Sequence, residues 1–189
     1  GKCAPCAAKS SARATWFPSR AGSSPSNMRL DAITLEHFRN YAHQSVTFDP
    51  SVNVIVGENA QGKTNLLDAV YFLSFCKSSG NPIDSQNIRH DQDFFVIQGF
   101  YEAEDGTPEE IYCGMKRRSK KQFKRNKKEY SRFSDHIGFL PLVMVSPADS
   151  ELIAGGSDER RRFMDVVISQ YDKEYLEALI RYNKALAQR

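Results

Sequence analysis

The sequence predicts an α/β fold in which a sheet surrounds a glycine-rich loop and a helical arm follows. A short β-branched run, residues 52–56, ends at Gly57, which is typical of a buried strand that enters a loop. Apolar residues then recur at helical spacing between Leu66 and Leu73. Near the end of the chain a second apolar set steps by four, three and four residues, the seam of a helix packed on another helix: Tyr175, Leu179, Tyr182 and Leu186.

Length and composition divide the chain into three parts. With 189 residues, of which 40% are hydrophobic, one sizeable core is expected. Residues 1–27 hold four basic residues, no acidic residue and few large apolar ones, so we expect a disordered leader or add-on with the native start at Met28. Residues 28–150 form the expected lobe around the loop. Residues 151–189 form the start of a helical arm, which we expect to be truncated.

The first half of the lobe is expected to contain three strands. Leu30, Ile33 and Leu35 indicate the first strand, and a polar turn follows at 37–41. Val46 and Phe48 alternate with polar residues in a second strand. The run 52–56 is then expected as a buried strand at the centre of the sheet.

The second half of the lobe continues with strands and a turn. Residues 94–101 are expected to form a strand, and the turn at 104–107 leads through a hairpin into a strand at 111–113. An apolar strand is expected over 140–145. After it, Ser157 is expected to cap a helix that carries two acidic residues in its first turn.

Cysteine content and hydropathy exclude two classes of protein. The four cysteines, at 3, 6, 76 and 113, are too few and too scattered for a disulfide scaffold. Cys3 and Cys6 have the spacing of half a zinc site, but no second ligand pair follows at a suitable distance. No stretch approaches about 18 consecutive apolar residues. We therefore expect a soluble cytoplasmic protein with no membrane partner.

The glycine-rich stretch is a complete phosphate-binding loop. Its glycines let successive backbone amides turn toward phosphate oxygens, and the helix that follows directs its amino end at the same charge. The lysine supplies a cation for the β- and γ-phosphates, and the threonine hydroxyl ligates Mg²⁺. The expected nucleotide-binding residues are Gly57, Glu58, Asn59, Ala60, Gln61, Gly62, Lys63 and Thr64, with Thr64 as the metal ligand.

A basic segment is the second candidate site. Outside residues 1–27 the chain has 22 basic and 23 acidic residues, so only a local cluster argues for a polyanionic partner. Nine of the thirteen positions from 116 to 128 are basic, enough to neutralise phosphates, although a solvated hairpin is an equal interpretation. The candidate DNA contacts are Lys116, Arg117, Arg118, Lys120, Lys121, Lys124 and Arg125.

From Met28 onward the chain resembles the RecF family, whose ATPase fold is shared with SMC and ABC-type ATPases. Three stretches carry the resemblance: the turn 37–41, the loop with its helix at 57–69, and residues 146–165. The resemblance implies an ATP-binding lobe over 28–150, with ATP and Mg²⁺ as cofactors and Arg39 touching the nucleotide. Arg161 and Arg162 match a family motif near the junction with the helical arm, and a structural basic face is an equal interpretation.

The resemblance also implies a role in recombinational DNA repair and replication. Expected partners are DNA at junctions of single strand and duplex, RecR, and RecA, which the family helps to load at gaps. The complete protein is expected to form an ATP-dependent homodimer.

Catalysis by this chain alone is not expected. The family's signature motif and Walker B acid lie downstream of the motifs present here, and no catalytic residue is assigned. Asp149, which follows the expected strand 140–145, is an alternative acid, and a surface carboxylate before a helix is the simpler interpretation. Two other functions stay open: a nuclease on the same ATPase fold, and an inert or dominant-negative fragment.

Overall fold

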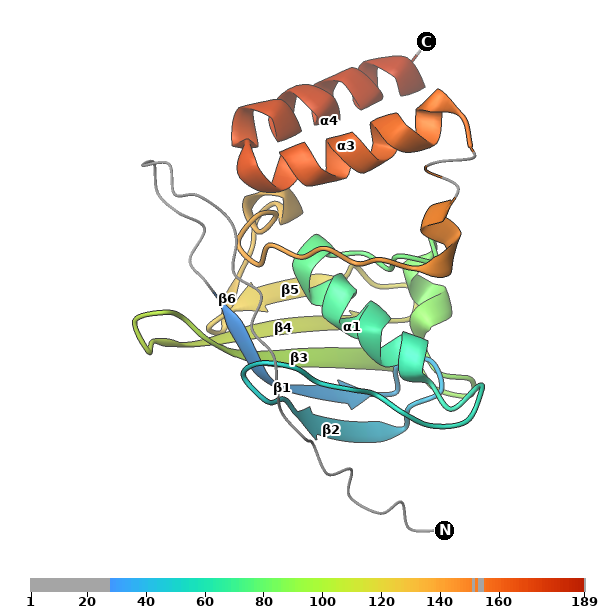
Figure 1. Cartoon of the computed structure of the whole chain (residues 1–189), viewed down its shortest axis with the longest axis vertical. Helices are drawn as coiled ribbons and strands as arrows, with labels where there is room; N and C mark the ends of the chain where they lie inside the picture. Colours follow the sequence, from blue (N-terminus) through green and yellow to red (C-terminus); the bar gives the residue numbers. More distant parts are fainter. Residues whose placement is uncertain (1–27, 151, 153–154, 189) are drawn as a thin grey trace.

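A six-stranded antiparallel sheet forms the base of the lobe (Figure 1). The computed structural model describes residues 28–150, 152 and 155–188. The strand order is β2-β1-β3-β4-β5-β6, and every neighbouring pair is antiparallel. The strands are β1 (Arg29–Glu36), β2 (His43–Thr47), β3 (Phe94–Glu102), β4 (Pro108–Lys116), β5 (Gln122–Arg125) and β6 (Lys128–Glu129).

The helix α1 covers one face of this sheet, and a helical pair lies beyond it (Figure 1). Three 3₁₀ turns connect the elements. The helices are α1 (Lys63–Phe75), α3 (Ser157–Tyr171) and α4 (Lys173–Ala187), and the turns are η1 (Asp84–Asn87), η2 (Phe133–Asp135) and η3 (Pro147–Ser150).

The core lies between α1 and the covered face of the sheet. Along β3, Phe95 and Ile97 are fully buried while their neighbours are only partly covered, as the two-residue period of a strand requires. Three aromatic rings meet edge to face with centroids 5.5 to 6.3 Å apart: Phe38, Phe72 and Phe95. The core therefore joins the turn after β1, the helix α1 and the centre of the sheet.

Several expected elements are confirmed. The alternating segments near residues 30–35, 46–48, 94–101 and 111–113 are β1, β2, β3 and β4. The hairpin between β3 and β4 is closed by two backbone hydrogen bonds, from the amide of Ala103 to the carbonyl of Thr107 and from the amide of Gly106 to the carbonyl of Ala103. The helix after the loop is α1, although Leu67 lies outside its buried face and is 48% exposed.

The two expected apolar strands at 52–56 and 140–145 are not strands in this structure. Val54 and Val56 are 70% and 69% exposed, and Val143 and Val145 are 69% and 81% exposed. A strand needs a neighbour that accepts and donates its backbone hydrogen bonds, and the six strands formed by the described residues pair only with one another. Leu140 itself is buried, and its carbonyl accepts a hydrogen bond from the Ser74 hydroxyl.

The helices α3 and α4 pack on each other, but the second half of the expected apolar seam lies outside this contact. The Tyr175 hydroxyl on α4 donates to Asp165 on α3, while Tyr182 and Leu186 remain 61% and 50% exposed. The expected cap at Ser157 is wrong: α3 begins after Gly156, and no side chain caps it. Its first turn is acidic as expected, and both acids pair with arginines one turn later: Asp158 with Arg161 and Glu159 with Arg162.

Candidate nucleotide-binding site

The phosphate-binding loop runs directly into the amino end of α1. Gly62 is the last residue before the helix and has φ +101°, a left-handed conformation that favours glycine. The first intrahelical hydrogen bond runs from the Leu66 amide to the Gly62 carbonyl. The loop is therefore held in the orientation that presents a helix amino terminus to an anion.

The turn after β1 lies against this loop and fixes it. The Asn40 side-chain amide donates to the Gln61 carbonyl at 3.1 Å, and the Tyr41 hydroxyl donates to the Gly62 carbonyl at 3.0 Å. A Cβ atom on Gly62 would lie only 2.5 Å from the Asn40 side chain. Asn40 also accepts a hydrogen bond from Asn65 on α1. The backbone angle of Gly62 therefore disfavours any other residue, and a side chain there would also displace Asn40 from the loop.

Lys63 folds back over the loop. Its ammonium donates to the carbonyls of Gly57 and Glu58, both at 2.7 Å. These two hydrogen bonds use two of the three N–H donors of the ammonium, so one donor remains for an anion bound at the loop.

Arg39 lies beneath the loop in a polar network. Its guanidinium forms an ion pair with Asp68 at 2.7 Å, and its three nitrogens donate to the side chains of Asn65, Ser78 and Asn87. Asp68 is only 2% exposed and also accepts hydrogen bonds from the side chain of Ser78 and from the backbone and side chain of Ser79. The network ties the turn after β1 to α1 and to the segment that follows α1.

The other expected loop residues lie at the surface. Glu58, Asn59, Ala60 and Gln61 are exposed, and Ala60 has a positive φ of 65° that contributes to the curl of the loop. Thr64 is exposed in the first turn of α1, where its hydroxyl is accessible.

The described residues contain no cluster of three or more metal-ligating side chains. Asp149, the alternative acid, accepts a hydrogen bond from the amide of Ser146, the residue just before the 3₁₀ turn η3. The Cys3 and Cys6 pair lies outside the described residues.

The basic segment 116–128 divides into two groups. Lys121 points inward, where its ammonium lies 2.6 Å from Asp84 and donates to the Cys76 carbonyl. Arg125 pairs with Glu109 and lies 3.9 Å from the centre of the Phe139 ring. The remaining candidates, which are exposed or half-exposed, lie at the end of the hairpin or on its outer face: Lys116, Arg117, Arg118, Lys120 and Lys124.

Sequence reasoning missed the residues that hold the loop from outside. Asn40 and Tyr41 clamp it, while Asn65, Asp68 and Ser78 anchor Arg39. Four of these five lie within the stretches 37–41 and 57–69 that carry the family resemblance. Their position in those stretches could have marked them as part of the site. That the turn 37–41 contacts the loop and its helix could be seen only in the folded structure.

Comparison with known proteins agrees with this geometry. The model of the family described as "AAA domain" matches residues 32–184. The protein named DNA replication and repair protein RecF from Bacteroides thetaiotaomicron is 83% identical over 162 residues, which are 86% of this chain and 44% of that protein. Its counterpart in Flavobacterium johnsoniae is 50% identical over 162 residues, or 86% of this chain and 45% of that protein. The chain thus spans less than half the length of these curated relatives.

Solved structures give the same result. A structure described as the recombination mediator protein RecF-ATPrS in the RecFOR pathway has a TM-score of 0.81 and 35% sequence identity, over 85% of this chain and 43% of that one. A structure from work on ATP-driven dimerization of SMC ATPases has a TM-score of 0.61 and 17% identity, over 74% of this chain and 99% of that one, which supports the fold alone.

No helix in the described part of the chain has the length and apolar character needed to cross a membrane. The family match covers most of the chain, and the RecF relatives match it at high identity over the region that contains the loop, its clamp and the helical pair. The chain therefore belongs to the AAA-domain family and, within that family, to the RecF proteins, less than half of whose length it spans.

Proposed function

We propose that this chain binds ATP with Mg²⁺ through the loop 57–64 and that the protein acts as an ATP-dependent DNA-binding protein in repair and replication. The observation that carries the proposal is the clamped loop: a glycine at which any side chain would be strained, a lysine folded over the loop, and a helix amino terminus behind it. The AAA-domain match and the RecF structure described with bound nucleotide support the same assignment.

Each residue of the loop has a defined task in this proposal. Lys63 directs its remaining N–H donor at phosphate oxygens, and the exposed Thr64 hydroxyl holds Mg²⁺. Bound Mg²⁺ would neutralise charge on the phosphates. Arg39, tied to Asp68, contacts the nucleotide by releasing one of its side-chain hydrogen bonds.

The nucleotide proposal is tested by titrating a fluorescent ATP analogue into the chain and into two lysine variants. Lys63→Ala removes the cation at the loop, and Lys77→Ala removes an exposed lysine just beyond the end of α1. We expect Lys63→Ala to weaken binding at least tenfold, because a charge-assisted contact to phosphate is lost, while Lys77→Ala changes it less than twofold. Equal binding by all three proteins would show that the loop is not the site.

The DNA proposal is supported by the exposed cations of the basic segment and by the names of the relatives. Lys116, Arg117, Arg118, Lys120 and Lys124 replace the original set of seven, because Lys121 and Arg125 are committed to carboxylates inside the protein. Contacts with the DNA backbone are expected, so affinity should fall steeply as salt rises. Affinity for DNA that does not change with salt would remove this surface from the proposal.

The partners of the complete protein are carried over from its relatives. RecF is described in the solved structures as a recombination mediator of the RecFOR pathway. On that basis we propose that the complete protein forms a homodimer when ATP binds, acts at junctions of single strand and duplex, and cooperates with RecR to load RecA. Nucleotide-dependent dimerisation of a complete relative, measured by light scattering with and without ATP, tests the first of these steps.

A further inference from the structure

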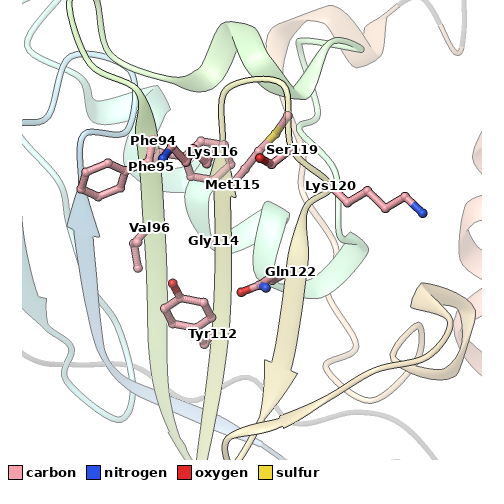
Figure 2. A pocket seen from close by; sticks show the side chains of 10 residues that line it. All are labelled: Phe94, Phe95, Val96, Tyr112, Gly114, Met115, Lys116, Ser119, Lys120 and Gln122. Atoms are coloured by element: carbon pink, nitrogen blue, oxygen red, sulfur yellow. The ribbon is translucent and has the colours of Figure 1, made fainter.

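The outer face of the sheet, opposite α1, contains a hollow of about 300 Å³ that the proposed nucleotide-binding loop does not use (Figure 2). Figure 2 shows its walls, which come from β3, β4, the turn after β4, and the start of β5. The side chains that matter to the argument are Tyr112, Lys116, Ser119, Lys120 and Gln122.

The hollow exists because one position in the sheet has no side chain. Val96, Gly114 and Gln122 are paired across β3, β4 and β5, so they form one row on the outer face. The middle member of that row is glycine. Tyr112, two residues earlier on the same face, places its hydroxyl toward Gly114 (Figure 2). A Cβ atom on Gly114 would lie 2.5 Å from that hydroxyl oxygen.

The polar groups around the hollow are not used by the protein. Among the described residues, no hydrogen bond or ion pair engages the side chains of Tyr112, Lys116, Ser119, Lys120 or Gln122. Burial is the main cause that raises the pKa of the Tyr112 phenol, so the ring stays neutral. The hollow therefore combines a neutral aromatic wall with unengaged donors and acceptors.

Positive charge surrounds one end of the hollow. Lys116 and Lys120 lie at its rim, where Lys120 extends outward (Figure 2). The Lys124 ammonium lies 5.4 Å from the centre of the Tyr112 ring. Two acidic side chains are also near the hollow. Glu36 on β1 is paired across the strands with Val96, and its charge contributes to the raised pKa of Tyr112, while Glu110 accepts a hydrogen bond from the Gln98 side chain. A ligand with a flat apolar part and an anionic part matches this distribution of charge.

We propose that the hollow binds one nucleotide of single-stranded DNA, with the base against Tyr112 and its phosphate at Lys116 and Lys120. Bases stack on aromatic side chains whatever their sequence, and lysines at the rim neutralise the adjoining backbone. Gln122 and Ser119 offer hydrogen bonds to a base edge. This inference rests on the proposed DNA binding and assigns it a subsite that prefers unpaired strands.

The test compares two oligonucleotides of equal length and charge, oligodeoxythymidylate and the same backbone without bases. Binding is measured by fluorescence anisotropy with the unaltered chain and with Tyr112→Leu and Tyr112→Phe. We expect the unaltered chain and Tyr112→Phe to prefer the strand with bases about tenfold, and Tyr112→Leu to lose that preference, because stacking needs the ring. All variants are first checked by circular dichroism.

A second variant protects the test against misfolding of Tyr112→Leu. Gly114→Ala adds a methyl group at the floor of the hollow and must displace the Tyr112 hydroxyl, which lies at the end of a side chain that can rotate. It should reduce the same preference several-fold while leaving the strand without bases unaffected. Retained preference in both well-folded variants would overturn the subsite.

A matched pair of double variants tests the phosphate end. Lys116→Gln with Lys120→Gln should weaken binding of both strands and lower the salt dependence by about 0.7 per lost phosphate contact. Lys127→Gln with Lys128→Gln removes the same charge from exposed positions outside the hollow and should change binding much less. Equal effects of the two double variants would show that the lysines act only through general surface charge, and would overturn the proposed phosphate contact at Lys116 and Lys120.

Two outcomes separate this inference from the function on which it rests. If the unaltered chain binds neither strand, both the DNA proposal and the subsite are overturned. If it binds both strands equally, DNA binding stands and the subsite alone is overturned. Free thymidine monophosphate is the third probe: competition at concentrations no higher than those of the oligonucleotide would assign the hollow to a free nucleotide and not to DNA.

Discussion

The hairpin of β4 and β5 has two faces that share a basic composition and differ in what their cations do. On the inner face, Lys121 and Arg125 are paired with Asp84 and Glu109. On the outer face, Lys120 and Lys124 make no ion pair among the described residues, although Lys124 lies over the Tyr112 ring. The comparison teaches that charge density along the chain does not identify a binding surface, because the two-residue period of a strand sends neighbouring cations to opposite environments.

The two faces should differ most in how much stability is lost when a lysine is replaced, and the adjacent residues Lys120 and Lys121 allow a direct comparison. Lys121→Gln should lower the free energy of unfolding by about 2 to 3 kcal/mol, because it removes a buried ammonium that pairs with Asp84, donates to the Cys76 carbonyl and lies over the Phe72 ring. Lys120→Gln should change it by less than about 0.5 kcal/mol. Denaturation by urea measures both, and equal losses would show that the two faces do not differ in this way.

The inner face should also respond to acid. His136 is fully buried, its ring lies 4.7 Å from the centre of the Phe123 ring, and its Nε2 donates to the Leu73 carbonyl at 2.7 Å. Burial lowers the pKa of His136 from 6.5 to about 4. Between these values the unfolded chain binds a proton that the folded chain does not, so the free energy of unfolding should fall by about 3 kcal/mol as pH drops through this window.

The control for this pH dependence is His136→Asn, which keeps a donor but cannot titrate. It is expected to be less stable at neutral pH and to lack most of the loss between pH 6.5 and 4. Stability measured by thermal unfolding at several pH values separates the two effects. An unchanged slope in the variant would assign the acid response to other groups.

A smaller effect is expected at Arg125. Its guanidinium pairs with Glu109 and covers the Phe139 ring, but its side chain is 40% exposed. Arg125→Gln should cost about 1 to 2 kcal/mol, less than Lys121→Gln, because water screens the half-exposed guanidinium and the buried Glu109 carboxylate keeps its hydrogen bond from the Asn126 side-chain amide. DNA affinity should change less than it does on removal of Lys116 and Lys120, and a larger change would return Arg125 to the DNA surface.

The site was more predictable than the sheet. The loop 57–64 needs glycines at fixed positions and a helix directly after it, so neighbouring residues identify it without knowledge of the fold. The segments 52–56 and 140–145 have the apolar, β-branched composition of strands, but a strand also depends on a partner that lies elsewhere in the chain. The local sequence pattern of these two segments therefore does not determine whether they pair with another strand.

The sequence by itself determined the glycine-rich loop with its helix and the antiparallel hairpin of β3 and β4, because each depends on residues that are close together in the chain. Only the tertiary structure decided that Asn40 and Tyr41 clamp the loop, that Asp68 holds Arg39, and which lysines of the basic segment face solvent. Those contacts join residues up to 37 positions apart. Their formation depends on how the helix and sheet pack, and no local pattern in the chain encodes that geometry.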